Sequence, residues 1–262
     1  MRDSAMRSVA VPSRLRLLAF IVVALCGLLG IGPARAGEAK VAVAANFTEA
    51  AEEIGRAFQR KTNHVAVFSF GATGQLYAQI NQGAPFEVFL SADRATATKA
   101  ADQGFGIGPS QFTYAVGKLV LYSKNRQTVR GERTLKEGTF TKLAIANPAA
   151  APYGAAAVET MKALGVYETL MPKIVQGQNI TQAVQFVETG NAELGFVALS
   201  QVGGHTNGSR WIVPAPFHAA ISQDAILLKL GAANPAAQSF IDFLKGVEAS
   251  RITEKSGYGA GH

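Results

Sequence analysis

The stretch Lys40-Val-Ala-Val-Ala-Ala45 indicates the start of the fold, because a short apolar run of this kind is typical of a buried strand. A segment with apolar residues at helical spacing follows it directly, with Ala50, Ile54 and Phe58 on one face. The folded part of the chain is therefore expected to begin with a strand that leads into an amphipathic helix.

Two more strands follow this helix. The apolar run at 65–69 predicts the second strand, a short helix ends at Gly83, and 87–91 predicts the third strand. Strands that alternate with single helices form βαβ units, in which the strands are parallel and helices cover both faces of the sheet. The sequence therefore predicts an α/β fold with a mostly parallel sheet.

Long extended runs interrupt this alternation twice, at 112–123 and at 220–228. Between them the pattern predicts strands at 143–146, 174–175 and 194–199 and helices at about 152–164 and 180–189. After the second run we expect two C-terminal helices. The first begins at Asn234-Pro235, with asparagine as the cap and proline at the first helical position, and the last ends near Gly257.

Two α/β patterns joined by two extended runs predict two lobes with a two-strand hinge. The first lobe would comprise residues 37–117 and 225–262, and the second would comprise residues 118–224. The alternative is one large doubly wound sheet.

Residues 1–36 have the pattern of a targeting segment. Four arginines precede the apolar run at 17–29, and Ala34-Arg-Ala36 has the form of a signal-peptidase site. We expect a signal peptide that is cleaved after Ala36, with export to the periplasm and loss of the only cysteine, Cys26. An uncleaved membrane anchor is the alternative, but the run is short for a spanning helix of roughly 20 residues.

The composition argues against a nucleic-acid partner. The 262-residue chain has a formal net charge of +7, but residues 1–36 contain five of its 25 basic and one of its 18 acidic residues. The remaining 20 basic and 17 acidic residues give only +3. A domain so close to neutral has no electrostatic footprint for a polyanion or a membrane surface.

Catalytic motifs are missing from the sequence. It has no G-x-S-x-G elbow, no H-E-x-x-H motif and no phosphate-binding P-loop, and its four histidines are scattered. We therefore expect a binding protein with no catalytic residue, no cofactor and no metal ion held directly. An exported hydrolase is the competing interpretation.

Four predicted turns from a strand into a helix could meet at a ligand. They lie at 45–49, 69–75, 151–154 and 178–182, and we expect Asn46 and Asn179 to cap two of the helices. In doubly wound sheets such turns lie where ligands bind, and helix N-termini attract anions through unpaired N–H groups and the macrodipole. No Lys or Arg lies beside any of the four expected helix starts, so we expect a small oxyanion held by neutral donors.

A site made only of donors also discriminates between anions. Near neutral pH inorganic phosphate keeps a P–OH proton, which would lack an acceptor at a cost of roughly 1–3 kcal/mol or more. Sulfate, molybdate and tungstate are fully deprotonated and have no such penalty. The residues alone therefore favour a tetrahedral dianion without choosing between these three.

The stretches at 43–47, 77–93, 112–122, 146–148, 151–154 and 194–198 resemble the periplasmic molybdate-binding proteins, and the similarity covers nearly all of 38–258. The resemblance implies a class II periplasmic binding fold that closes on its ligand, and delivery of molybdate, and of tungstate as well, to a molybdate ABC permease in the inner membrane. It also implies a monomer.

Carried over by position, the resemblance implies that the oxyanion is bound by Asn46, Thr73 and Tyr153 and by the backbone of Ala45 and Ile180. Molybdenum would be bound as the oxyanion and not as a metal ion. Some members have tyrosine at the position of Ala198 and a small residue at that of Tyr153, so a phenol would lie on the other side of the site here. The alternative ligands are sulfate, thiosulfate or an organic carboxylate.

Overall fold

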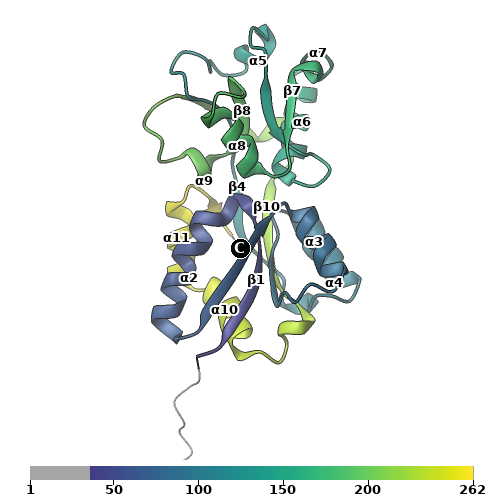
Figure 1. Ribbon diagram of the computed structural model, residues 1–262, viewed down its shortest axis with the longest axis vertical. Coiled ribbons are helices and arrows are strands. Elements are labelled where there is room, and N and C mark those ends of the chain that lie inside the picture. Colours follow the sequence, from purple (N-terminus) through teal and green to yellow (C-terminus); the bar gives the residue numbers. More distant parts are fainter. Residues whose placement is uncertain (1–35, 262) are drawn as a thin grey trace, which may run out of the picture. The chain divides into compact units, whose positions relative to one another are not determined.

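The computed structural model describes residues 36–261, and the chain divides into the units 1–36 and 37–262. The predicted signal peptide therefore lies outside the described residues, apart from Ala36. The second unit contains two β-sheets, each with its own helices (Figure 1).

The first sheet has six strands in the order β11-β4-β10-β3-β1-β2. Their bounds are β1 Glu38–Ala44, β2 Val65–Gly71, β3 Val88–Leu90, β4 Phe112–Gly117, β10 Ile221–Leu227 and β11 Gly259–Ala260. Strand β1 pairs parallel with β2 and β3, as the βαβ pattern predicts. Strand β10 pairs antiparallel with β3 and β4.

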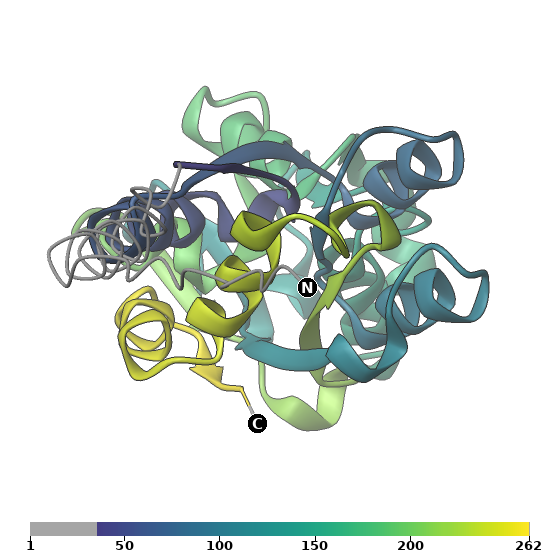
Figure 2. The ribbon, with the colours of Figure 1, turned by 90° about the horizontal axis from the view of Figure 1, so that it is seen from below.

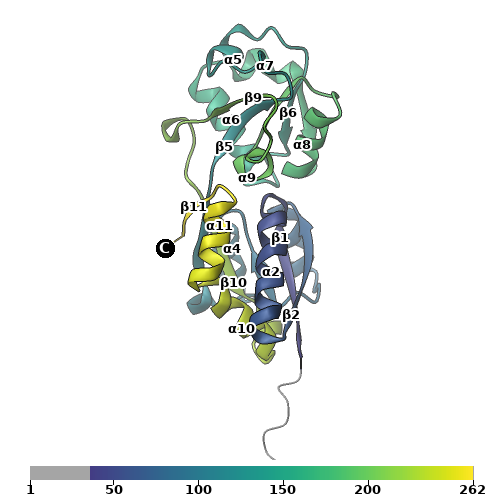
Figure 3. The same ribbon diagram turned by 90° about the vertical axis from the view of Figure 1, so that its left-hand side faces the viewer.

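Helices cover both faces of the first sheet. They are α2 Thr48–Thr62, α3 Thr73–Asn81, α4 Arg94–Asp102, α10 Pro235–Leu244 and α11 Val247–Lys255. Alternate residues of β1 point to opposite faces, so Val41 and Val43 pack with α2 and α10 whereas Ala42 packs with α3 and α4. The C-terminal helix α11 lies against α2, as Figure 2 and Figure 3 show.

The second sheet has five strands in the order β7-β6-β8-β5-β9. Their bounds are β5 Leu119–Ser123, β6 Leu143–Ala146, β7 Ile174–Gly177, β8 Leu194–Ala198 and β9 Ser209–Ile212. The helices around it are α5 Arg133–Glu137, α6 Pro152–Ala163, α7 Tyr167–Leu170, α8 Ile180–Glu188 and α9 Leu199–Val202. One apolar core joins these elements.

The chain passes between the sheets twice. Strand β4 ends at Gly117 in the first sheet and β5 begins at Leu119 in the second, so the predicted extended run at 112–123 is two strands. The return lies between Ile212 of β9 and Ile221 of β10, and the predicted boundary at 224/225 falls inside β10. The expectation of mostly parallel sheets holds within β2-β1-β3 and β7-β6-β8. Because the strands next to the crossings, β5 and β10, pair antiparallel, both sheets are mixed.

Candidate functional site

The N-terminal ends of four helical segments meet around one small cavity. The 3-10 segment η1, Ala45–Phe47, which runs into α2, and helix α3 come from the first lobe, and α6 and α8 come from the second. The lining residues are Ala44, Ala45, Asn46, Gly71, Ala72, Thr73, Ala92, Ala151, Pro152, Tyr153, Asn179 and Ile180. All five predicted site residues are among them.

Three of the four helix starts have alanine where a capping side chain would stand. These residues are Ala44 before η1, Ala72 before α3 and Ala151 before α6, and none of them accepts a hydrogen bond through its side chain. The first N–H groups of a helix have no partner inside the helix, so these starts keep free donors. Only α8 has the predicted cap, because Asn179 Oδ1 accepts from the Gln182 N–H at 3.0 Å.

The prediction that Asn46 caps a helix is wrong. Asn46 lies inside η1, and its buried Nδ2 donates to Gln223 Oε1 at 2.8 Å and to the Tyr258 hydroxyl at 3.0 Å. An amide nitrogen has two hydrogens, and both are engaged. The backbone N–H of Asn46 is therefore the donor that this residue can offer to the cavity.

Thr73 lies at the start of α3 with its hydroxyl already oriented. The Ala92 N–H donates to Thr73 Oγ1 at 3.0 Å, and both residues line the cavity. Because this bond occupies a lone pair of the hydroxyl oxygen, the hydroxyl hydrogen is left to be donated. Thr73 is thus a donor toward the cavity.

Tyr153, the second residue of α6, has its side chain in the cavity wall and is only 1% exposed. Its hydroxyl accepts from Gln223 Nε2 at 3.3 Å. Burial, with smaller contributions from Tyr258 and Tyr114, raises the pKa of Tyr153 well above its ordinary value. The phenol therefore keeps its proton and can donate it in a hydrogen bond. Ala198 ends β8 and is not among the lining residues, so the phenol comes from α6.

Three polar residues behind the cavity were missed by the reasoning from sequence. Gln223 on β10 is fully buried, and Tyr114 on β4 donates to its Oε1 at 3.1 Å. Tyr258, just before β11, donates to the backbone carbonyl of Asn46 at 2.5 Å. A signal for Gln223 was present, since three polar residues at 222–224 interrupt an otherwise apolar run.

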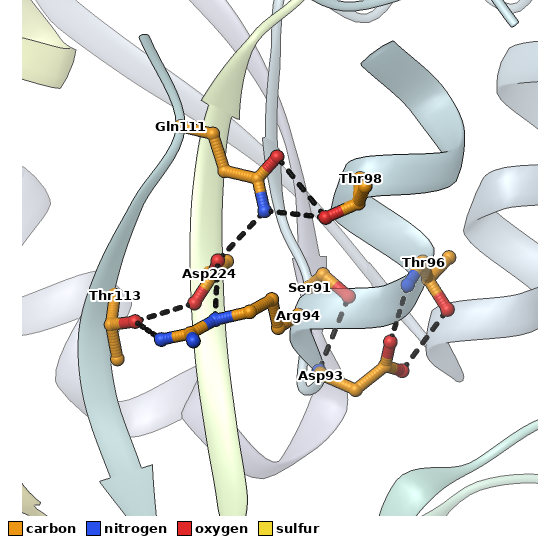
Figure 4. A network of polar contacts seen from close by, with 8 residues as sticks. All are labelled: Ser91, Asp93, Arg94, Thr96, Thr98, Gln111, Thr113 and Asp224. Atoms are coloured by element: carbon orange, nitrogen blue, oxygen red, sulfur yellow. Dashed lines mark hydrogen bonds and ion pairs between the residues drawn. The ribbon is translucent and has the colours of Figure 1, made fainter. Parts of the chain in front are cut away.

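Within residues 36–261, no charged side chain lines the cavity. Asp224 follows Gln223 in the sequence, and its buried carboxylate interacts with groups outside the cavity. Thr113 donates to it at 2.7 Å, Gln111 donates to it at 2.8 Å, and Arg94 Nε lies 3.4 Å away (Figure 4). A more open hollow shares Thr73 with the cavity, but Asp93 and Glu159 line it. Those carboxylates make the hollow unsuitable for an anion, whereas the small cavity is neutral and rich in donors.

The model of the bacterial extracellular solute-binding protein family matches residues 39–259. The chain belongs to this family. The solute-binding protein is 53% identical over 236 residues to the molybdate-binding protein ModA of Rhodobacter capsulatus, a match that covers 90% of this chain and 94% of the relative. It is 51% identical to ModA of Azotobacter vinelandii, over 92% of this chain and 98% of the relative.

The solved structures include a similar fold. The periplasmic molybdate-binding protein of Azotobacter vinelandii superimposes with a TM-score of 0.81 at 37% identity, over 84% of this chain and 98% of that one. The likeness confirms the two-lobed α/β fold of a periplasmic binding protein. The family also confirms that the chain is a solute-binding protein and not an enzyme. Among the described residues, no helix is long and apolar enough to cross a membrane.

Proposed function

We propose that this solute-binding protein captures molybdate between its two lobes, binds tungstate in the same way, and delivers the anion to an ABC permease of the inner membrane. The observation that carries the proposal is the neutral cavity at four helix starts, three of which lack a capping side chain. Relatives named for molybdate binding, more than 50% identical over nearly the whole chain, support the choice of ligand.

The proposed contacts are all donors. Thr73 and Tyr153 offer hydroxyl hydrogens, while Ala45, Asn46 and Ile180 offer backbone N–H groups. A dianion without protons can accept every one of them. Hydrogen phosphate would place its own O–H against these donors, at a cost of about 1–3 kcal/mol, so it should bind more weakly.

The proposed mechanism is closure without chemistry. Donors from both lobes contact one anion, so the anion favours the arrangement in which the lobes meet around it. We take residues 117–119 and 213–220 as the two crossings about which the lobes would move. The permease would then recognise the closed form.

The proposed location is the periplasm. Export would use the segment 1–36, with cleavage after Ala36, and the mature chain would act as a monomer with no nucleic-acid partner. The small net charge of +3 beyond residue 36 supports the proposal that it has no nucleic-acid partner.

Titration calorimetry of the mature chain, 37–262, tests the proposal with molybdate, tungstate, sulfate and phosphate in turn. We expect one-to-one binding that is tight for molybdate and tungstate and weak for the other two. Binding of sulfate in preference to molybdate would instead make the chain a transporter component for another tetrahedral oxyanion. No binding of any of these anions would overturn the site.

Two substitutions locate the site. Thr73→Ala and Tyr153→Phe each remove one hydroxyl donor to a charged ligand and should weaken molybdate binding by roughly tenfold or more without unfolding the protein. Thr73→Ser, which keeps the hydroxyl, is the matched control. Unchanged affinity in both variants would contradict this placement.

A further inference from the structure

We propose that Gln223 is a positioning residue, which sets the direction of the Tyr153 hydroxyl so that its hydrogen is turned toward the ligand. The inference rests on the proposed function and adds the group that controls anion selectivity. It follows from a chain of buried hydrogen bonds in which each donor fixes the next.

The chain of bonds begins at a group whose role is fixed. A backbone carbonyl can only accept, so Tyr258, 2.5 Å from the carbonyl of Asn46, must donate its hydroxyl hydrogen there. The Tyr258 oxygen can then only accept from the side chain of Asn46, 3.0 Å away. This contact orients the Asn46 amide, with Nδ2 toward Tyr258.

The orientation of Asn46 fixes Gln223. The second hydrogen of Asn46 Nδ2 goes to Gln223 at 2.8 Å, so the atom of Gln223 that faces Asn46 must be the acceptor, Oε1. The Tyr114 hydroxyl also approaches this atom, at 3.1 Å. The nitrogen of the Gln223 amide is consequently the atom that faces Tyr153.

Gln223 in turn fixes Tyr153. Nε2 of Gln223 donates to the Tyr153 oxygen at 3.3 Å. Among the described residues the tyrosine hydroxyl has no acceptor within hydrogen-bond distance, so its hydrogen is free for the cavity. Had the Gln223 amide the opposite orientation, Tyr153 would donate to it and turn a lone pair toward the ligand.

The backbone makes room for this contact. Gln223 lies on β10, beside a shift of register between Gln223 and Asp224 where β10 pairs with β4. Gln223 pairs with Ala115 of β4, and Gly117 lies two residues further along that strand; a Cβ atom at Gly117 would lie 2.2 Å from the Tyr153 hydroxyl and 2.9 Å from Gln223 Nε2. Glycine therefore allows the side chains from the two lobes to meet behind the cavity.

The consequence concerns selectivity. The Tyr153 and Thr73 hydroxyls each accept a hydrogen bond from a fixed donor, so both present a hydrogen to the anion. A ligand that itself carries an O–H meets these hydrogens where it would need an acceptor, and only one lone pair remains on each hydroxyl oxygen. Gln223 thus governs the ratio of the affinities for molybdate and hydrogen phosphate while touching neither.

Two substitutions of Gln223 test this role by calorimetry at mildly alkaline pH, where both anions are dianions. Gln223→Met removes the donor and should weaken molybdate binding by about tenfold. Gln223→Glu offers only acceptors while its carboxyl is ionised, and Tyr153 must then donate to it. We expect the ratio of molybdate to phosphate affinity to fall at least tenfold, since the added charge acts equally on two dianions.

Tyr114→Phe is the matched control. It removes a buried bond to the same Oε1 without altering the bond between Gln223 and Tyr153, so the affinity ratio should stay at the wild-type value. Circular dichroism and thermal unfolding check that each variant is folded.

A double-mutant cycle separates positioning from a merely structural role. In the Tyr153→Phe background, Gln223→Met should have almost no further effect on molybdate affinity, because no hydroxyl remains to be oriented. An equal loss of molybdate affinity on Gln223→Met in the wild-type and Tyr153→Phe backgrounds would overturn the proposal. A wild-type ratio of molybdate to phosphate affinity in both Gln223 variants would also overturn it. A wild-type protein that binds no oxyanion would instead overturn the proposed function, so the two failures are distinguishable.

Discussion

At the scale of single residues, the candidate site depends on groups that contact no ligand. Gly117 is the clearest case, because it is the residue on β4 that leaves space for the Tyr153 hydroxyl. A hydrogen bond of 3.3 Å between Gln223 and Tyr153 leaves no room for an added carbon between them. The smallest side chain is thus required where two lobes contribute polar groups.

We predict that Gly117→Ala weakens molybdate binding by more than tenfold, since the new methyl group must displace Tyr153 or Gln223. Gly108→Ala is the control, because a Cβ atom there would meet only Ala101 Cβ at an ordinary 3.8 Å. Calorimetry on both variants checks the prediction. Equal affinities for the two would show that the Tyr153 hydroxyl does not contribute to binding.

The pKa of Tyr153 gives a prediction for pH dependence. Burial raises this pKa well above its ordinary value of about 10, so the proton is retained and molybdate affinity should stay constant as the pH rises to about 10. Because the folded protein holds the Tyr153 proton more tightly than the unfolded chain does, the free energy of unfolding should decrease only above about pH 10. Titrations across this range test it, and an affinity that declines below pH 10 would show that the phenol ionises.

At the scale of elements, the helix starts divide into two classes. Three of the four at the cavity, η1, α3 and α6, begin after an alanine and have no side-chain cap. Helix α10, which contributes no residue to the cavity lining, begins with a side-chain cap: Asn234 Oδ1 accepts from the Ala236 N–H at 2.9 Å. Helices α5, α7, α9 and α11 also lack a side-chain cap, so what distinguishes the cavity is that three uncapped starts meet there.

We predict that Asn234→Ala lowers the free energy of unfolding by about 1–2 kcal/mol. The side chain also donates to the Glu38 carbonyl at 2.7 Å and to Glu87 Oε1 at 2.8 Å, and alanine loses these bonds too. Asn234→Ser retains a capping oxygen, so it should lose less. Denaturant unfolding of both variants measures these changes. An equal loss of unfolding free energy in the two variants would mean that the cap itself contributes little. Molybdate affinity should be unchanged in either.

At the scale of the whole described unit, a few hydrogen bonds join the lobes around the cavity. The Gly74 N–H of α3 donates to the Ala150 carbonyl at 2.9 Å, and Ser200 of α9 donates to the Asn46 carbonyl at 3.0 Å. Thr181 of α8 donates to the Ala45 carbonyl at 3.4 Å. These contacts would form only when the lobes meet, so they contribute to the closed form.

We predict that Thr181→Val favours the open form, because it removes one of these bonds while keeping the shape of the side chain. Molybdate affinity should fall by roughly two- to tenfold, and small-angle scattering should give a larger radius of gyration for the ligand-free protein. Thr181→Ser retains the hydroxyl and is the control. A valine variant with wild-type affinity and radius would show that this bond does not affect closure.

The α/β alternation, the two groups of strands, the helix starts and the lack of Lys and Arg beside them can all be predicted from the sequence. These features are local, because hydrophobic periodicity and capping involve residues only a few positions apart. The five predicted site residues line one cavity for this reason: strand-to-helix turns lie together at the ends of strands.

Which groups at the site donate hydrogen bonds depends on long-range packing. The Asn46 amide was expected to cap a helix, but it bonds to Gln223, 177 positions away, and Gln223 bonds to Tyr153, 70 positions away. The antiparallel pairing of β10 also appeared only in the tertiary structure. Such partners are brought together by packing of both lobes, and no local pattern in the chain encodes the direction of a buried hydrogen bond.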